Sequence, residues 1–234
     1  MPTRNAVVAG ATGAIGSELV RRLLTSNTYA RIVALTRRPL PEDDPRLLVV
    51  PAQFDALGRV LAPALTPHRA IDGFCCLGTT IRTAGSRAAF RLVDHDYVLS
   101  FARWTLEHEV RRLVVVSALG ADAASRVFYN RVKGETEAGL RSLGFGRNAL
   151  VIVRPSLLDG QRAELRVGER LALAVTRPVR ALIPARVRPI PVEDVAQSML
   201  DAALARTAPI IIESESMQGA SAAGSNSKQA ISAG

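Results

Sequence analysis

Aromatic residues make up only 4% of this 234-residue chain, and lysine is rarer still, with two lysines among 30 basic residues. So few aromatic rings leave no convincing platform for stacking nucleic-acid bases, and the arginines are scattered along the chain instead of being gathered in a stripe. The net charge of +9 therefore does not predict a nucleic-acid partner. With 48% hydrophobic residues, the chain can bury a full core as one domain.

Cysteines and long apolar runs are also scarce. The two cysteines, Cys75 and Cys76, are adjacent. On a strand their side chains point to opposite faces, which disfavours a disulfide between them and predicts reduced, buried thiols. The three histidines share no metal-ligand spacing, so we predict no metal site. No apolar run is long enough to cross a bilayer, and a core strand takes the place of a signal peptide, which predicts a cytoplasmic protein without a membrane partner.

The N-terminus carries a glycine-rich turn between an apolar strand and an amphipathic helix. Residues 6–9 are apolar, three glycines follow at three-residue intervals, and leucines then recur at helical spacing. Glycines at this spacing let the backbone approach a pyrophosphate, whose charge is met by the N–H groups of the new helix. The turn therefore predicts a dinucleotide site made by Gly10, Thr12, Gly13, Ala14, Ile15 and Gly16.

The second predicted strand, residues 31–35, ends in two arginines. A site that prefers NAD usually places an acidic residue there to hold the adenosine ribose, and this chain has Arg37 and Arg38 instead. Guanidinium groups match a 2′-phosphate in charge and geometry, which favours NADP(H), with NAD(H) less suited. The alternative is that both are ordinary surface charges of an arginine-rich chain.

Further apolar runs predict the remaining strands of a parallel sheet, whose carboxyl ends form the ligand edge. They cover residues 46–50, 71–77, 113–116 and 150–153, and a long helix is predicted from about 87 to 108. The residues at or just after the ends of these strands, and so expected beside the cofactor, are Phe54, Asp55, Leu77, Gly78, Thr79, Ser117 and Pro155. The sequence thus predicts an α/β doubly wound parallel sheet, the Rossmann fold.

One tyrosine and one lysine are spaced for chemistry. Tyr129 and Lys133 are four residues apart, so on a helix they share a face. A nearby ammonium favours the ionised form of a phenol, which suits exchange of a proton with a carbonyl or alcohol. The alternative is a solvated polar turn of helix.

Together, these motifs resemble the short-chain dehydrogenase/reductase superfamily in its atypical branch. Segments 76–80, 93–97, 117–122 and 133–137 resemble Tat-interacting-protein-like oxidoreductases and their bacterial relatives, which are often labelled nucleoside-diphosphate-sugar epimerases. The resemblance implies an NADP(H)-dependent oxidoreductase acting on a small carbonyl or alcohol. Tyr129 would be the proton donor or acceptor, Lys133 would bind the nicotinamide ribose, and Ser117 would polarise the reacting oxygen. An NADPH-binding regulatory or redox-sensing protein and a nucleotide-sugar epimerase are the alternatives.

The C-terminal third is expected to supply a small substrate-pocket portion. Arg162 and Arg166 are candidates for binding an anionic substrate, or belong to a solvated charged face, and Asp194 is expected to cap or orient. We expect one domain over residues 1–213 and a flexible tail over 214–234, because the tail is rich in Ser, Ala and Gly. A homodimer through the helices that carry residues 93–104 and 129–140 is a hypothesis.

Overall fold

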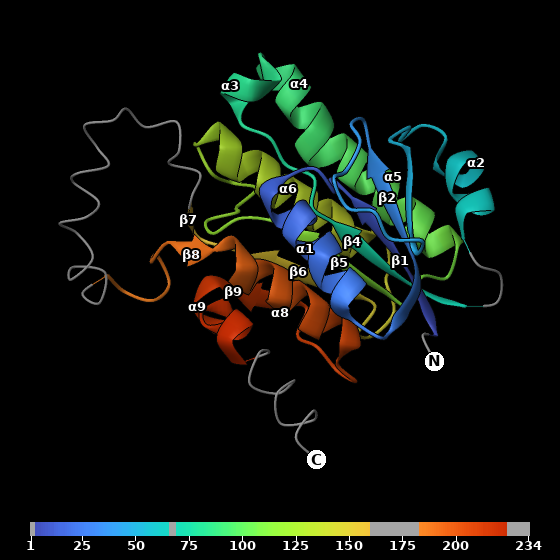
Figure 1. Cartoon of the computed structure of the whole chain (residues 1–234). Coiled ribbons are helices and arrows are strands. Elements are labelled where there is room, and N and C mark those ends of the chain that lie inside the picture. The colour runs from blue at the N-terminus through green and yellow to red at the C-terminus, as the bar shows by residue number, and fades with distance from the viewer. Residues whose placement is uncertain (1–2, 66–68, 160–182, 224–234) are drawn as a thin grey trace.

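The computed structural model describes residues 3–65, 69–159 and 183–223. Its centre is a seven-stranded parallel sheet in the order β3-β2-β1-β4-β5-β6-β9, which confirms the predicted doubly wound α/β fold (Figure 1). The strands are β1 (Arg4–Ala9), β2 (Tyr29–Thr36), β3 (Leu47–Pro51), β4 (Ala70–Cys75), β5 (Arg112–Val116), β6 (Leu150–Arg154) and β9 (Ile211–Glu213). The order reverses between β1 and β4, and open parallel sheets bind ligands in the crevice at such a switch point.

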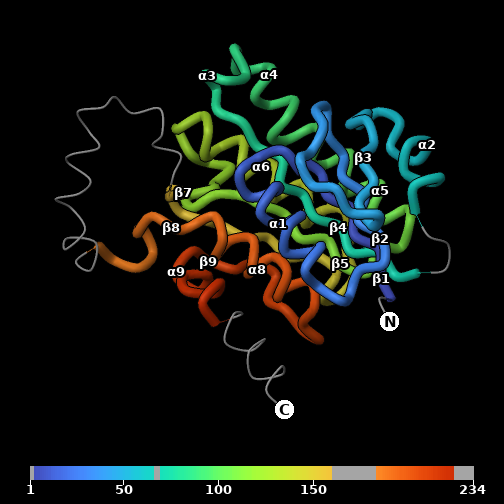
Figure 2. Tube along the Cα trace, in the orientation of Figure 1, coloured from blue at the N-terminus to red at the C-terminus, as the bar shows by residue number. Residues whose placement is uncertain are grey.

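Helices cover both faces of the sheet, so the central strands are buried on both sides. On one face α1 (Ala14–Thr25) and α8 (Val192–Leu204) lie side by side, as Figure 1 and the trace in Figure 2 show. The other face is covered by α2 (Leu57–Leu61), α5 (Tyr97–Glu107) and α6 (Phe128–Ser142). Alternation along β5 sends Val114 into the first layer and Val115 into the second.

Shorter elements surround the carboxyl edge of the sheet. They are α3 (Ile81–Ala84), α4 (Arg87–Arg91) and a small parallel pair of β7 (Leu158–Asp159) and β8 (Ile190–Pro191), whereas the 3-10 turn η1 (Ala62–Ala64) follows α2 and leads to the start of β4. Thr80 caps α3 and Ser86 caps α4, each hydroxyl accepting a backbone N–H three residues on. These caps fix how the chain enters the two helices next to the ligand edge.

The long helix expected from about 87 to 108 is confirmed, because helical structure runs without a break from 87 to 107, but it contains one irregular turn. The structure divides it into α4, a π-helical turn η2 (Leu92–Asp96) and α5. A π-turn holds one extra residue, which leaves a carbonyl without its regular partner and redirects the side chains. Here the carbonyl of Asp94 accepts a hydrogen bond from the Thr136 hydroxyl of α6, at 3.0 Å, so a tertiary contact stabilises the irregular turn.

The structured part of the chain continues past the expected boundary at residue 213. Ser214–Met217 form α9, and Ser214 and Met217 are fully buried. Asp194, at the start of α8, accepts hydrogen bonds from the backbone N–H groups of Gly219 and Ser221. The tail expected from 214 is therefore ordered at least through the described residue 223, because a carboxylate and an apolar anchor hold it; residues 224–234 lie outside the described residues.

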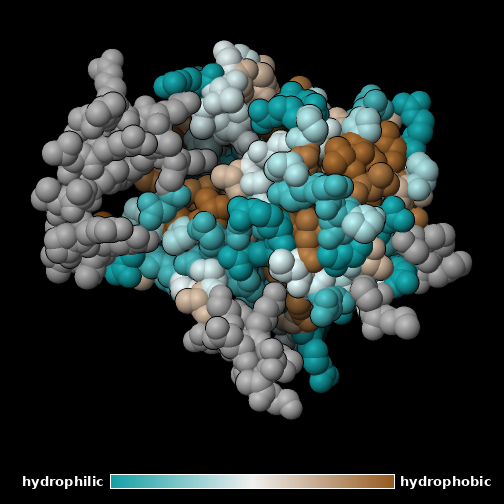
Figure 3. All heavy atoms as spheres, in the orientation of Figure 1, coloured by the Kyte–Doolittle hydropathy of each residue, from teal (hydrophilic) through white to brown (hydrophobic). Residues whose placement is uncertain are grey.

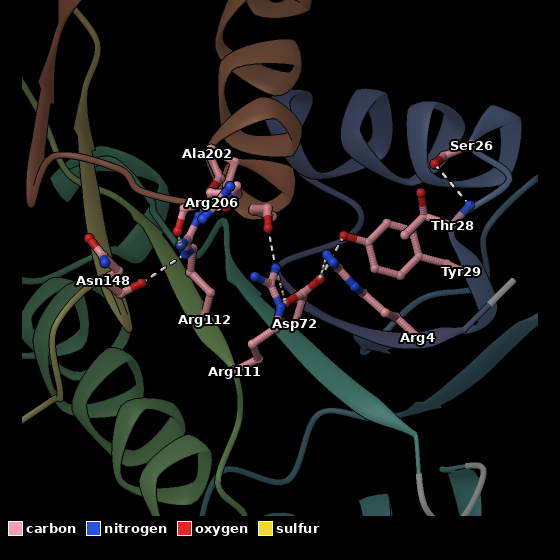
Figure 4. Close-up of polar contacts among 12 residues, drawn as sticks. Arg4, Ser26, Thr28, Tyr29, Asp72, Arg111, Arg112, Asn148, Ala202 and Arg206 are labelled. Atoms are coloured by element: carbon pink, nitrogen blue, oxygen red, sulfur yellow. Dashed lines mark hydrogen bonds and ion pairs between the residues drawn. The ribbon is translucent and has the colours of Figure 1, made fainter.

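A polar cluster lies at the edge of the sheet opposite the carboxyl edge, where the strands begin (Figure 4). Asp72 has a fully buried carboxylate that accepts from the Tyr29 hydroxyl at 3.0 Å, and it is paired with Arg4 at 3.3 Å and Arg111 at 2.7 Å. The neighbouring Arg112 donates to the Asn148 carbonyl and to carbonyls at the end of α8. This cluster ties β1, β2, β4 and β5 to the C-terminus of α8.

The visible face in Figure 3 is mostly hydrophilic, and apolar atoms are exposed on it in small separate areas. Within the described ranges, no helix combines the length and apolar character needed to cross a membrane.

Candidate functional site

A cavity of about 720 Å³ opens at the carboxyl edge of the sheet, where β1, β4, β5 and β6 end. Ten of the seventeen residues predicted for the site line it: Gly13, Ala14, Ile15, Leu77, Gly78, Thr79, Ser117, Tyr129, Lys133 and Pro155. The other seven, Gly10, Thr12, Gly16, Arg37, Arg38, Phe54 and Asp55, are not among its lining residues. The fold thus brings the glycine turn and the Tyr129-Lys133 pair to one cavity.

The glycine turn is shaped by close backbone packing. Gly10 has φ +81°, and a Cβ there would lie 2.6 Å from the Cys76 carbonyl oxygen; a Cβ on Gly16 would overlap the Gly10 carbonyl. Only glycine fits both positions, and the turn brings the start of α1 to the cavity. No acidic side chain lies in the first turn of α1, and Gly13 has no side chain to cap it. The first-turn N–H groups have no partners within the helix, so the turn fits an anionic pyrophosphate.

The residues expected around the adenosine end lie on the surface or in the core. Arg37 and Arg38 are exposed directly after β2, and none of the ion pairs between described residues involves them. The Thr36 hydroxyl accepts from the Arg38 N–H and so fixes the bend that presents both arginines. Phe54 is buried, with its ring stacked 4.6 Å from the Tyr97 ring, whereas Asp55 is exposed.

Lys133 is almost fully buried, and its ammonium forms an ion pair with Asp94. Its Nζ lies 2.8 Å from Asp94 Oδ1, and the two side chains are 4% and 0% exposed. The other carboxylate oxygen accepts the Thr79 N–H at 2.9 Å. Burial by itself lowers the pKa of Lys133, but the Asp94 carboxylate, with a smaller contribution from Tyr129, raises that pKa above its usual value. The lysine therefore stays charged beside the cavity.

Ser117 follows β5, but its hydroxyl is directed to a second buried acid. Its Oγ donates to Glu137 Oε1 at 2.6 Å. Glu137 also accepts from Arg154 Nε at 2.9 Å, and Arg154 in turn pairs with Glu213 on β9. The hydroxyl proton of Ser117 is thus directed to Glu137 on α6, so the serine offers its lone pairs, not its proton, to the cavity.

Tyr129 stands at the first turn of α6 and is half-buried. Its ring lies 5.6 Å from the ring of Phe90 in α4, and the phenol borders the cavity one helical turn before Lys133. The contact with Phe90 restricts the ring, because aromatic pairs at this separation attract in a tilted geometry. The contact with Phe90 therefore holds the Tyr129 ring at the wall of the cavity.

The far side of the cavity is mostly apolar. Leu119, Leu157, Leu158 and Val187 contribute to its lining. The Ser156 hydroxyl there donates to the Arg188 carbonyl. Arg162 and Arg166, considered above for anion binding, lie outside the described residues.

Asp94 and Glu137 were not predicted as site residues. Asp94 lies in segment 93–97, which was noted only for its resemblance to the family. The sequence did not point to its side chain, because no sequence pattern marks a π-turn. Glu137 did carry a signal, because it lies four residues after Lys133 and so continues the same helical face. In the described ranges, no group of three or more His, Cys, Asp or Glu side chains is arranged to hold a metal ion.

Known proteins are similar to this chain in sequence. The NAD(P)H-binding family model matches residues 10–205. Protein HTATIP2 of Rattus norvegicus is 36% identical over 175 residues, covering 74% of this chain and 70% of the relative. The mitochondrial protein FMP52 of Eremothecium gossypii is 35% identical over 159 residues, covering 68% of each chain.

Solved structures share the architecture at lower identity. A short-chain dehydrogenase from Burkholderia cenocepacia in complex with NADP has a TM-score of 0.62 at 16% identity, covering 99% of this chain and 97% of its own. MoeE5 in complex with UDP-glucose and NAD has a TM-score of 0.63 at 19% identity, covering 89% and 76%. At these identities the likeness shows the fold. With the family match, the glycine turn and the relatives, this chain belongs to the NAD(P)H-binding Rossmann-fold family, in the atypical short-chain dehydrogenase/reductase group of HTATIP2 and FMP52.

Proposed function

We propose that this protein is an NADP(H)-dependent oxidoreductase that transfers a hydride to or from a small carbonyl or alcohol, with Tyr129 as the proton donor or acceptor. The observation that carries the proposal is that the glycine turn, Tyr129 and Lys133 border one cavity. The cofactor supplies the hydride chemistry, and the chain supplies orientation and proton transfer.

Each residue would have a distinct task in this reaction. The first-turn N–H groups of α1 would hold the pyrophosphate, and Arg37 and Arg38 would hold the 2′-phosphate. Lys133, kept charged by Asp94, would bind the ribose hydroxyls. Tyr129 would give its proton to the carbonyl oxygen during reduction and take one from the alcohol during oxidation.

Calorimetric titration of the cofactor-free protein with NADPH and NADH tests the cofactor assignment. Wild-type protein should bind NADPH at least about 10-fold more tightly, because a charge-assisted contact to the phosphate contributes about 1.5–3 kcal/mol. Arg37→Ala/Arg38→Ala should remove this preference, whereas Arg21→Ala/Arg31→Ala, two arginines away from the cavity, should keep it. Equal weakening of both cofactors by the first pair would contradict the 2′-phosphate assignment.

The competing functions differ in measurable ways. A nucleotide-sugar epimerase would keep and recycle its cofactor, whereas a reductase releases NADP at each turnover. A regulatory NADPH-binding protein would bind without turnover. Thiol-based redox sensing has little support from Cys75, because burial raises the pKa of its thiol to about 12 and suppresses the reactive thiolate.

The location and the oligomeric state stay predictions. The sequence favours the cytoplasm, while the FMP52 relatives are named as mitochondrial proteins. Light scattering tests the proposed homodimer: a mass equal to one chain of 25.0 kDa would exclude it.

A further inference from the structure

Asp94 sits in the one irregular turn of the helical segment that borders the cavity. The π-helical turn η2 places its side chain inward, where the carboxylate is 0% exposed. The Thr136 hydroxyl of α6 lies 3.0 Å from the backbone carbonyl oxygen of Asp94 and 2.7 Å from that of Val132, so the two carbonyls share its proton. Single π-turns interrupt helices frequently at functional sites, because they redirect a side chain that a regular helix would send elsewhere.

The carboxylate joins two parts of the cavity wall. Oδ1 is paired with Lys133 at 2.8 Å, and Oδ2 accepts the Thr79 N–H at 2.9 Å. Gly78 lies directly over this pair, since a Cβ on it would be 3.7 Å from Asp94 Oδ1 and 4.0 Å from Lys133 Nζ. Asp94 therefore fixes both the direction of the ammonium and the loop that follows β4.

A buried ammonium needs this partner to remain charged. Transfer of a lysine from water into a protein interior favours the neutral amine, and a carboxylate in contact reverses that preference. The other titratable groups near Lys133 are Tyr129 on its own helix and Cys75 on β4. Glu137, one turn further along α6, has its carboxylate bound by Arg154 and Arg141.

We propose that Asp94 is a positioning residue of the site: its carboxylate is the buried counter-ion that holds the Lys133 ammonium charged and aimed beside the nicotinamide-binding end of the cavity. The role of Lys133 toward the cofactor rests on the proposed function. The charge and direction of Lys133 do not, so they are open to measurement without turnover.

The scarcity of lysine makes a direct test available. The chain has only Lys133 and Lys228, so Lys228→Arg leaves one lysine, and a protein labelled with carbon-13 at the lysine ε-carbon gives one signal to follow against pH by NMR. In that background Asp94→Asn keeps an oxygen to accept the Thr79 N–H but removes the charge. Asp96→Asn is the matched control, because Asp96 lies two residues away with a side chain 51% exposed.

With Asp94 intact, the Lys133 signal should titrate above the ordinary lysine pKa of about 10.4. Asp94→Asn should lower the midpoint by at least about one pH unit, since burial is then opposed only by the smaller effects of Tyr129 and Cys75, and Asp96→Asn should leave it unchanged. NADPH affinity of Asp94→Asn should fall about 10-fold as the pH rises through the new midpoint, because a charged donor becomes a neutral one. A folded Asp94→Asn protein with the wild-type midpoint would overturn the proposal.

The supporting hydroxyl provides a second pair of variants. Thr136→Val removes the donor to the Asp94 carbonyl and should lower the Lys133 midpoint in the same direction by a smaller amount, while Thr136→Ser should restore it. If Asp94→Asn does not fold, the two Thr136 variants provide the test. Equal Lys133 titration midpoints in Thr136→Val and Thr136→Ser would then overturn the proposal. If NADPH does not bind although the Lys133 midpoint shifts, the proposed function fails and the counter-ion assignment stands.

Discussion

The two edges of the sheet each bury an aspartate with a basic partner, but they differ in what else surrounds it. At the edge where the strands begin, Asp72 contacts two arginines and the Tyr29 hydroxyl. These contacts join the beginnings of β1, β2 and β4 (Figure 4). At the carboxyl edge, Asp94 meets one lysine and one backbone N–H beside a cavity. The contacts of Asp72 are all with other parts of the protein, whereas the lysine that pairs with Asp94 also borders the cavity.

The choice of cation follows the same division. Planar guanidinium groups form several fixed bonds at once, and Arg111 reaches both Asp72 and the Ala203 carbonyl. An ammonium is a compact charge on a flexible stem, which suits a site where a cofactor and a proton must be accommodated. A buried ion pair is therefore a weak guide to function until its surroundings are known.

Tyr129→Phe should produce the largest effect, and only at the carboxyl edge. We expect turnover with a responsive carbonyl substrate to fall by at least about 100-fold, because the proton carrier is lost. NADPH affinity and thermal stability should change little, since the ring and its contact with Phe90 remain. Steady-state NADPH oxidation and calorimetry provide the measurement, and equal loss of binding and turnover would contradict the proton-transfer role.

Asp72→Asn should act in the opposite way. It leaves Arg4 and Arg111 without their carboxylate partner, so the free energy of unfolding should fall by about 3 kcal/mol. This value is at the lower end of the range for breaking a buried ion pair, because both arginines are partly exposed. Tyr29→Phe, which removes only one hydrogen bond, should cost about 1 kcal/mol. Urea unfolding measures the free energy of unfolding of both variants. If folded Asp72→Asn protein lost NADPH affinity at low temperature, the claim that Asp72 acts only on stability would be contradicted.

Asp194→Asn adds a third buried aspartate to the two above, and its carboxylate is held mainly by hydrogen bonds. Burial raises its pKa, but hydrogen bonds from Ser221 and Gly219 together outweigh burial and hold the pKa below its usual range. The stability it contributes is present above the unfolded pKa of about 4 and is lost as the pH falls through the lower folded pKa. We expect a loss of about 1 kcal/mol at pH 7 that disappears at acid pH. A difference that stays constant from pH 7 to 3 in urea unfolding would refute this assignment.

Cys75 should show the smallest effect. The thiol is fully buried and its pKa is raised to about 12, so alkylation at pH 8 should be negligible in the native state and rapid in urea. Mass spectrometry after timed iodoacetamide treatment follows both cysteines, and Cys76 is partly exposed. Fast native labelling of Cys75 would restore the redox-sensing alternative.

The sheet and one side of the cavity were predictable from the amino-acid sequence alone. Strand hydrophobicity and the glycine spacing of residues 10–16 are local patterns, and parallel strands end at a common edge, so Gly78, Ser117 and Pro155 were predictable at the wall of the cavity. The spacing of Tyr129 and Lys133 was likewise sufficient to place both on one helical face. These features depend on periodicity, which a single chain displays directly.

The ion pairs and hydrogen bonds of the buried charged side chains became visible in the folded structure and could not be predicted from the sequence. Asp94 reaches Lys133 because a π-turn, contacted by Thr136 from another helix, redirects its side chain. Ser117, directly after β5, donates to Glu137 because α6 brings this carboxylate within hydrogen-bond distance. Residues 214–223 are held in place because Asp194 accepts hydrogen bonds from this segment and Met217 is buried in the core. Such contacts join residues 20 to 40 positions apart or more, and no local propensity encodes them, since their energy arises only when the elements are packed together.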